Sequence, residues 1–301
     1  MEVFVRKIIL CIVFSLSVFA SDTGLHYVPG SVNMVGKLDV GSTLSVEGFK
    51  ENILKDSDGD LSELKALGLD PTEDVEDILF GVASNDQNPD QTRLIALIRY
   101  NRRVNLAEII TAYAKKHGRV LQSQDYRDVI IYELDKQENL AVTQQIEGEW
   151  SLFGDLDLVR DSIDLFHKQG KSASRNKQLM AQCQDGLLPH LFWAVGTIKG
   201  SAQNPGFKNV LLTVDYFDGF VVGGKLPFET EEEKAGINQT LSMGTGLIMM
   251  MAQGKMNPQD IEIKEHDDYI SFKIRISSEL IQSLKQQAAA MDGQTGEKPV
   301  Q

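Results

Sequence analysis

The spacing of the apolar residues constrains the fold of this chain more than any other feature, because it alternates between two periods. Runs with a spacing of two, typical of strands, are followed by runs with a spacing near 3.6, typical of helices. Residues 78–83 and 94–100 form β-rich runs joined by a stretch rich in Asn, Asp and Pro, which predicts a hairpin. After Asn105, a typical N-cap, apolar residues recur along one helical face until Gly118. The chain is therefore predicted to mix helices and strands.

The second half of the chain repeats this pattern. Residues 192–198 read as a strand, and 210–217 and 220–226 read as a hairpin whose turn is Asp218-Gly219. A long helix is expected to begin at Thr230, followed by three glutamates that favour the positive helix end. Residues 261–263 and 269–276 then predict another hairpin.

Both halves thus follow the order strand, strand, helix, strand, strand, helix. We expect an α+β fold of two similar units, each with antiparallel hairpins packed against helices. The expected divisions are a signal peptide at 1–20, a first unit at 21–186, a second unit at 187–291 and a disordered tail at 292–301.

The first twenty residues have the order of a signal peptide. Arg6 and Lys7 precede an apolar run, and Val18 and Ala20 stand at the −3 and −1 positions of a cleavage site. A membrane anchor is the alternative, but the 13 residues of 8–20 would rise only about 20 Å as a helix, short of a hydrocarbon core of ~30 Å. We therefore expect cleavage after Ala20 and an exported protein, periplasmic or extracellular.

Charge and cysteine content narrow the classes of protein further. The 301 residues carry a formal net charge of −13, which disfavours a protein that tracks nucleic-acid phosphates. After the leader no stretch approaches 18 consecutive apolar residues, so no stable membrane span is expected once the leader is cleaved. Cleavage leaves Cys183 alone, so an intramolecular disulfide is not possible and stability must come from the core. We read Cys183 as a small buried hydrophobe, and a reactive thiol is the alternative.

Several short segments carry a resemblance to a known group. Val28-Pro29-Gly30 opens the mature fold, the run 69–75 precedes the first hairpin, and Trp193 is followed by the Asp218-Gly219 turn. In these features the chain resembles a loose group of uncharacterised bacterial exported proteins with a duplicated α+β layout. The resemblance implies an exported α+β protein and transfers no catalytic residue.

Segments that match sequence motifs of binding sites lack essential positions. The run 219–225 has the spacing of a phosphate-binding loop, but Leu226 stands where Ser or Thr is required, and Pro227 blocks an immediate helix. The run 56–60 resembles a calcium loop, but neither register places carboxylates at both ends of the twelve-residue loop. The five histidines are scattered, and no serine-hydrolase elbow occurs. We assign no catalytic residue, no metal site and no cofactor.

Methionines give the predicted helix after Thr230 its distinctive composition. Met243, Met249, Met250 and Met251 lie within a short stretch, and their flexible thioethers suit either core filling or a groove that adapts to an apolar surface. We read these four as a candidate groove for a ligand or partner. Copper binding is the weaker alternative, because no Cys or His accompanies them.

Two classes of function remain open. We favour an exported, non-enzymatic protein that binds a protein or an apolar ligand of the cell envelope, and the alternative is a cell-envelope hydrolase with dispersed catalytic residues. A cleft with convergent titratable groups would favour the hydrolase, whereas an apolar patch on the methionine-rich helix would favour binding.

Overall fold

A computed structural model describes residues 24–44, 46, 58–84, 92–118, 120–135, 139–186, 190–198, 207–252, 254–281 and 283. The chain divides into two compact units, Met1–Thr213 (unit 1) and Val214–Gln301 (unit 2). The predicted signal peptide and the predicted disordered tail lie outside the described residues.

Unit 1 is built on eight strands in the order β8-β1-β2-β3-β7-β6-β5-β4. All neighbours in this order pair antiparallel. The strands are β1 (Met34–Asp39), β2 (Val75–Ala83), β3 (Arg93–Tyr100), β4 (Gln122–Tyr126), β5 (Val129–Asp135), β6 (Leu140–Thr143), β7 (Trp150–Asp155) and β8 (Phe192–Ile198).

Helices of unit 1 begin where the sequence offers capping groups. Asn105 accepts a hydrogen bond from the Glu108 N–H at 3.4 Å at the start of α5, and Asp70 accepts one from the Thr72 N–H at 3.0 Å at the start of α4. Asp155 precedes α6 but accepts instead from the Leu94 N–H on β3, at 2.8 Å. The helical segments are η1 (Gly24–Tyr27), α2 (Val40–Leu44), α3 (Asp58–Ala66), α4 (Pro71–Asp74), α5 (Leu106–Lys116), α6 (Leu156–Phe166), η4 (Ala173–Arg175) and α7 (Lys177–Gly186).

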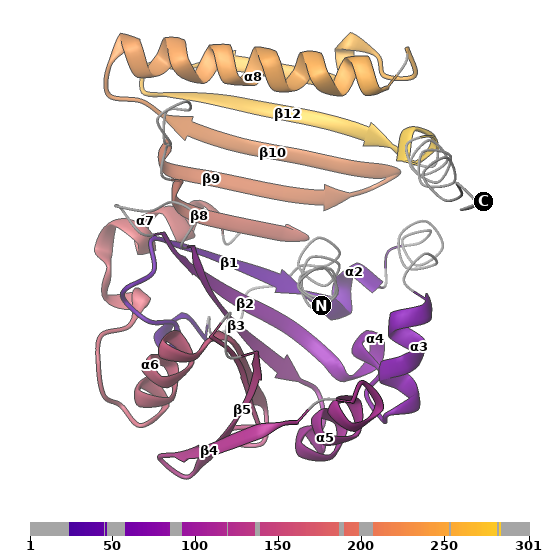
Figure 1. The fold of residues 1–301 in the computed structure, drawn as a ribbon. Coiled ribbons are helices and arrows are strands. Elements are labelled where there is room, and N and C mark those ends of the chain that lie inside the picture. The colour runs from indigo at the N-terminus through magenta and orange to yellow at the C-terminus, as the bar shows by residue number, and fades with distance from the viewer. Residues whose placement is uncertain are drawn as a thin grey trace, which may run out of the picture. The chain divides into compact units, whose positions relative to one another are not determined.

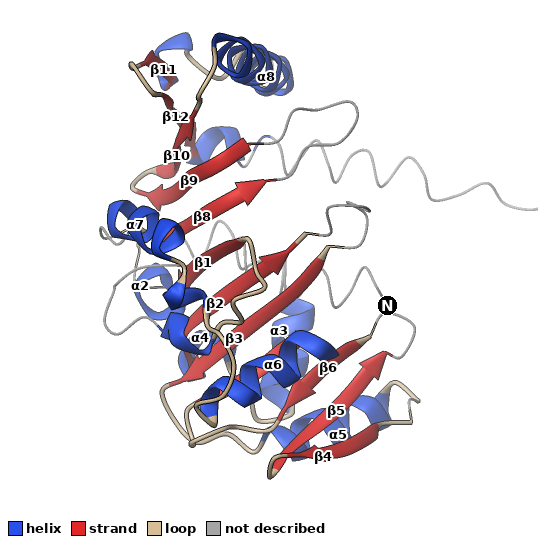
Figure 2. Cartoon of the chain, turned by 90° about the vertical axis from the view of Figure 1, so that its left-hand side faces the viewer, coloured by secondary structure: helices blue, strands red, loops and turns tan. Residues whose placement is uncertain are grey.

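The core of unit 1 lies between the sheet and the segments that cover one of its faces. Helix α6 buries Leu158, Val159 and Ile163 in this core and contacts β3, β6 and β7, and Figure 2 shows α6 in front of that part of the sheet. Trp150 and Trp193, which are the only two tryptophans of the chain, are both buried in the same cluster. Tryptophan fluorescence therefore reports on unit 1 alone.

The described part of unit 2 contains strands β10, β11 and β12, a long helix, and the helical residues 278–281. Strand β12 (Tyr269–Ser277) lies between β10 (Gly219–Pro227) and β11 (Ile261–Glu265), and both pairings are antiparallel. Helix α8 (Glu231–Met251) runs along β12 (Figure 1), and η5 (Pro258–Asp260) leads into β11. Strand β9 (Phe207–Tyr216) crosses the boundary between the units.

The expected α+β fold of two similar hairpin units is wrong. The twelve strands follow one another in a single hydrogen-bonded antiparallel order, and the two compact units differ in their content of strands and helices. The physical reason is a long-range pairing: β1 pairs with β8, so that Met34 lies opposite Gly196. This pairing satisfies the backbone groups on the second side of β1. It also joins a strand that the sequence did not predict, within the expected first unit, to a strand of the expected second unit. The observed boundary at Thr213 and Val214 falls later than the expected one at 186 and 187.

Candidate functional site

Helix α8 begins as its sequence predicts. Thr230 accepts a hydrogen bond from the Glu233 N–H at 3.1 Å, and the Glu233 carboxylate accepts one from the Glu229 N–H at 2.8 Å. These bonds satisfy backbone donors at the helix start, and the negative charges favour the positive end of the helix dipole. Lys234 pairs with Glu265 on β11 at 2.8 Å, and this hydrogen bond raises the pKa of Lys234 and lowers that of Glu265.

One face of α8 packs on its own unit. Ala252, just after the helix, is buried with Met256 and with Ile274 of β12. Ile248 and Met249 are half-buried against this cluster. The inner face therefore anchors α8 to the sheet of unit 2.

The opposite face of α8 exposes large apolar side chains in a line. Met243 is 58% exposed, Leu247 57% and Met250 70%. Their spacing of four and three residues places all three on one face of the helix, which Figure 2 shows nearly end-on. We call these three residues the α8 stripe. Single exposed apolar side chains are ordinary, but an aligned group of them marks an interaction surface.

The region around the α8 stripe carries no charge. Between Lys234 and Lys255 every residue from Ala235 to Gly254 is uncharged, although the whole chain has a net charge of −13. In the described part of the chain no helix is both long enough and apolar enough to cross a membrane. The run therefore forms an uncharged helix surface on an acidic protein.

The four methionines proposed from the sequence do not act as one set. Met243 and Met250 belong to the exposed stripe, whereas Met249 packs inward, and the side chain of Met251 lies outside the described residues. Sequence reasoning missed Leu247, which completes the stripe. The spacing of 243, 247 and 250 within an uncharged run was the signal that could have found it.

The other motifs weighed from the sequence serve the fold. The run with phosphate-loop spacing, 219–225, is part of strand β10 and pairs along its length with β12. The run with calcium-loop composition, 56–60, lies partly outside the described residues and otherwise begins α3. Within the described residues, no group of three or more His, Cys, Asp or Glu side chains could hold a metal ion.

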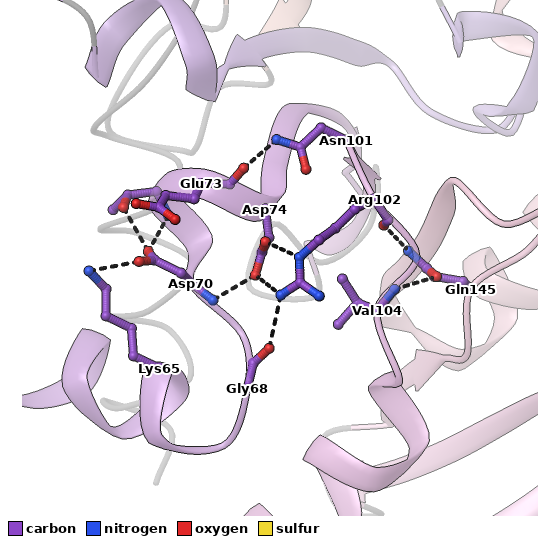
Figure 3. A network of polar contacts seen from close by, with 10 residues as sticks. Lys65, Gly68, Asp70, Glu73, Asp74, Asn101, Arg102, Val104 and Gln145 are labelled. Carbon is purple, nitrogen blue, oxygen red and sulfur yellow. Dashed lines mark hydrogen bonds and ion pairs between the residues drawn. The ribbon is translucent and has the colours of Figure 1, made fainter.

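A network of hydrogen bonds and ion pairs surrounds α4 in unit 1, and its polar groups bind one another (Figure 3). Arg102 donates through Nη2 to Asp74 at 2.6 Å and to the Gly68 carbonyl at 3.2 Å. Asp74 also accepts from the Asp70 N–H at 2.8 Å, and Asp70 pairs with Lys65 at 2.9 Å. Because these carboxylates are occupied by internal donors, we interpret the network as a clasp that joins α3, α4 and the end of β3.

A second charged group is buried in the sheet of unit 1. Lys37 Nζ lies 3.1 Å from Asp77 Oδ2, and Arg99 binds the same carboxylate oxygen. The side chains of Lys37 and Asp77 are only 5% and 3% exposed. In the register of the strands Trp193 pairs with Lys37 and Trp150 with Arg99, so a tryptophan stands beside each cation.

Two carboxyls with raised pKa values, Asp39 and Asp155, lie near opposite ends of strand β2 and do not approach each other. Burial is the main cause that raises the pKa of both Asp39 and Asp155. Asp39 pairs in register with Asp77 at one end of β2, whereas Asp155 bonds Leu94, which pairs with Val82 near the other end. Val82 lies five residues after Asp77 along β2, so these positions are about 17 Å apart. Asp39 and Asp155 therefore cannot act as a pair of catalytic carboxylates.

Asp164 of α6 is bound by neighbouring side chains of the same unit. Asp164 accepts a hydrogen bond from Tyr126 at 3.0 Å and pairs with Arg127 at 2.5 Å. This carboxylate thus ties α6 to the turn between β4 and β5.

Cys183 is fully buried, and burial raises its pKa to about 12, so its thiol is poorly suited to nucleophilic attack.

Comparisons of the chain with protein-family models, with curated proteins and with solved structures find no match. Within the described residues, the α8 stripe is the feature that most clearly indicates an interaction.

Proposed function

We propose that this protein is an exported, non-enzymatic protein that binds a protein partner through the α8 stripe. The observation that carries the proposal is the alignment of three side chains, Met243, Leu247 and Met250, each more than half exposed on one helix face. Their exposure to water is unfavourable, and a partner that covers them gains their burial.

The chemistry of the stripe favours an apolar protein surface as partner. Met and Leu side chains spaced along one helix face are the anchors by which a helix docks into a groove or against a second helix. Methionine adapts its shape to the surface that it meets, which suits a contact of this kind. The uncharged run around the stripe avoids the cost of burying an unpaired charge.

Export is the second part of the proposal, and it rests on the predicted leader at 1–20. The negative net charge favours a protein that stays in solution, and the apolar stripe provides a surface for specific contact with its partner. The net charge of −13 disfavours nucleic acid and anionic lipid surfaces as partners.

The test places a photo-crosslinking amino acid at position 247 of the full chain, produced in its own cells. A matched control carries the same amino acid at position 259, which is exposed in η5 of the same unit. We expect a covalent protein adduct from position 247 alone, and we expect the adduct to disappear when Met243→Glu and Met250→Glu are added. Adduct yields at positions 247 and 259 that do not differ would contradict the proposal.

A further inference from the structure

We infer that the partner of the α8 stripe is a second copy of this chain, packed antiparallel against the first along α8. This inference rests on the proposed function and names its partner. The spacing of the stripe is self-complementary about a two-fold axis that passes between Gly246 and Leu247. In that arrangement Met243 lies opposite Met250 of the second copy, and Leu247 lies opposite Gly246 of the second copy.

Gly246 supports a close approach by another helix. Glycine within a helix is unfavourable relative to alanine, yet Gly244 and Gly246 both lie in the interior of α8. A Cβ atom built at either position would have no atom of the described residues within 4 Å, apart from the backbone of its own helix turn and its chain neighbours. Packing within unit 2 therefore does not require glycine at these positions. A second helix that places its Leu247 against the backbone of Gly246 would require glycine at position 246.

Charge favours an antiparallel over a parallel pair. Glu231, Glu232 and Glu233 occupy the first turn of α8, so a parallel pair would bring six carboxylates together. In the register above, an antiparallel pair places the two acidic ends 29 helix positions apart, about 44 Å. It also opposes the two helix dipoles, and the contact itself lies within the uncharged run from Ala235 to Gly254. Two copies of an acidic chain can meet at this face without placing like charges in contact.

The size of the α8 stripe predicts a weak dimer. The exposed fractions of Met243, Leu247 and Met250 amount to roughly 350 Å² per copy, compared with about 800 Å² per partner in a standard stable interface. We expect a dimer that dissociates on the order of 1–100 µM, so its population depends on concentration.

Sedimentation velocity of the exported protein between about 1 and 200 µM tests the dimer. Leu247→Glu places a carboxylate at the two-fold axis and is expected to weaken association at least tenfold. Gln259→Glu adds the same charge at an exposed position outside the helix and should leave association unchanged. Far-UV circular dichroism shows whether both variants retain their helices. A wild-type protein that stays monomeric over this range would overturn the inference.

Disulfide crosslinking tests the register. The double variant Met243→Cys/Met250→Cys places cysteines opposite each other across the axis, and we expect an oxidant to join two copies covalently. The two positions are seven residues apart on one helix, about 10 Å, so they cannot bond within one copy. Met243→Cys alone should give little crosslink, because equivalent positions lie opposite each other only in a parallel pair. A crosslink from Met243→Cys as strong as that of the double variant would contradict the antiparallel register.

The photo-crosslinking experiment separates the two levels of the proposal. An adduct of twice the chain mass from position 247 supports self-association. An adduct of any other mass would leave the α8 stripe as a docking surface for a different protein and overturn the second copy as its partner. If position 247 gives no adduct above the control, the proposed function and this inference fall together.

Discussion

Loss of the buried carboxylate Asp77 is predicted to destabilise unit 1 strongly. Its side chain is 3% exposed and lies between Lys37 and Arg99, both of which bind its Oδ2 atom. Asp77→Asn keeps the shape of the side chain but removes the negative charge between the two cations. Removing one member of a buried ion pair typically costs 3–5 kcal/mol, because the remaining charge stays buried without compensation.

The neighbouring carboxylate provides a matched control. Glu76 also pairs with Arg99, at 3.0 Å, but its side chain is 49% exposed. Because Arg99 keeps this second partner in Asp77→Asn, we expect a loss near the lower limit, about 3 kcal/mol. Glu76→Gln removes the same charge from the same arginine at a solvated position and should cost less than about 1 kcal/mol.

Urea unfolding followed by tryptophan fluorescence measures both values in unit 1, since Trp150 and Trp193 are both buried there. With a denaturant dependence of about 2 kcal/mol per molar urea, Asp77→Asn should lower the midpoint by about 1.5 M, and Glu76→Gln by less than about 0.5 M. Adding Lys37→Met to Asp77→Asn removes one of the two cations and should restore part of the loss. Equal shifts for the two single variants would refute the role of burial in this reasoning.

Three further predictions concern unit 1. Cys183, fully buried with a pKa of about 12, should resist alkylation in the native protein and react once urea unfolds the chain; rapid native labelling, followed by mass spectrometry, would contradict this burial. Gly154→Ala should destabilise unit 1 by more than about 2 kcal/mol in the urea assay, because φ is +147° and the added Cβ would lie 2.0 Å from a carbonyl oxygen of β3. Burial would raise the pKa of Asp70, but hydrogen bonds from Thr72 and Lys65 outweigh it and lower the pKa. This carboxylate therefore stabilises the fold above its unfolded pKa near 4, and the effect is lost as pH falls through the lower folded pKa. Asp70→Asn should cost about 0.5–1 kcal/mol at pH 7 and less at pH 3, and an equal cost at both values would refute the charge argument.

Local patterns in the sequence predicted most individual elements. Strand β8 has the predicted bounds, 192–198, and the caps at Asn105 and Thr230 are confirmed. These elements are fixed by residues close together in the chain, namely by apolar periodicity and by side chains that bond the first helical turn. Such signals act over a few residues, which is why they can be read without knowing the fold.

The strand β1 escaped prediction for a physical reason. Its residues Lys37 and Asp39 are buried on the same side of the sheet as Val35, so the strand shows no run of alternating apolar residues. The burial of Lys37 is made possible by Asp77, which approaches from β2, and Asp39 accepts a local hydrogen bond from the Ser42 N–H. Without β1, the pairing that joins β2 to β8 could not be foreseen, and the two halves looked like independent repeats.

The candidate site was predicted only in part, since composition marked the helix but could not orient it. Consecutive methionines point in different directions around a helix, and only the packing of Ala252 and Ile248 on β12 shows which of them remain outside. Met249 turned out to be an inner residue and Met250 an outer one. The sequence located the helix, but the packing of unit 2 determines which of its residues form the exposed stripe.

The composition of α8 favours contact with another surface over stability of the isolated helix. Gly244 and Gly246 weaken the helix, and the hydroxyl of Thr245 bonds the Leu241 carbonyl, an arrangement that also slightly destabilises helices. The exposed stripe adds little to the packing of unit 2, because its side chains are more than half exposed and lie outside the buried cluster. Gly244 and Gly246 are two residues apart and therefore do not share a helix face, but Gly246 adjoins Leu247 of the stripe. A covering surface explains the stripe and Gly246 together, because it buries the apolar side chains and uses the space that the missing Cβ atom at position 246 leaves.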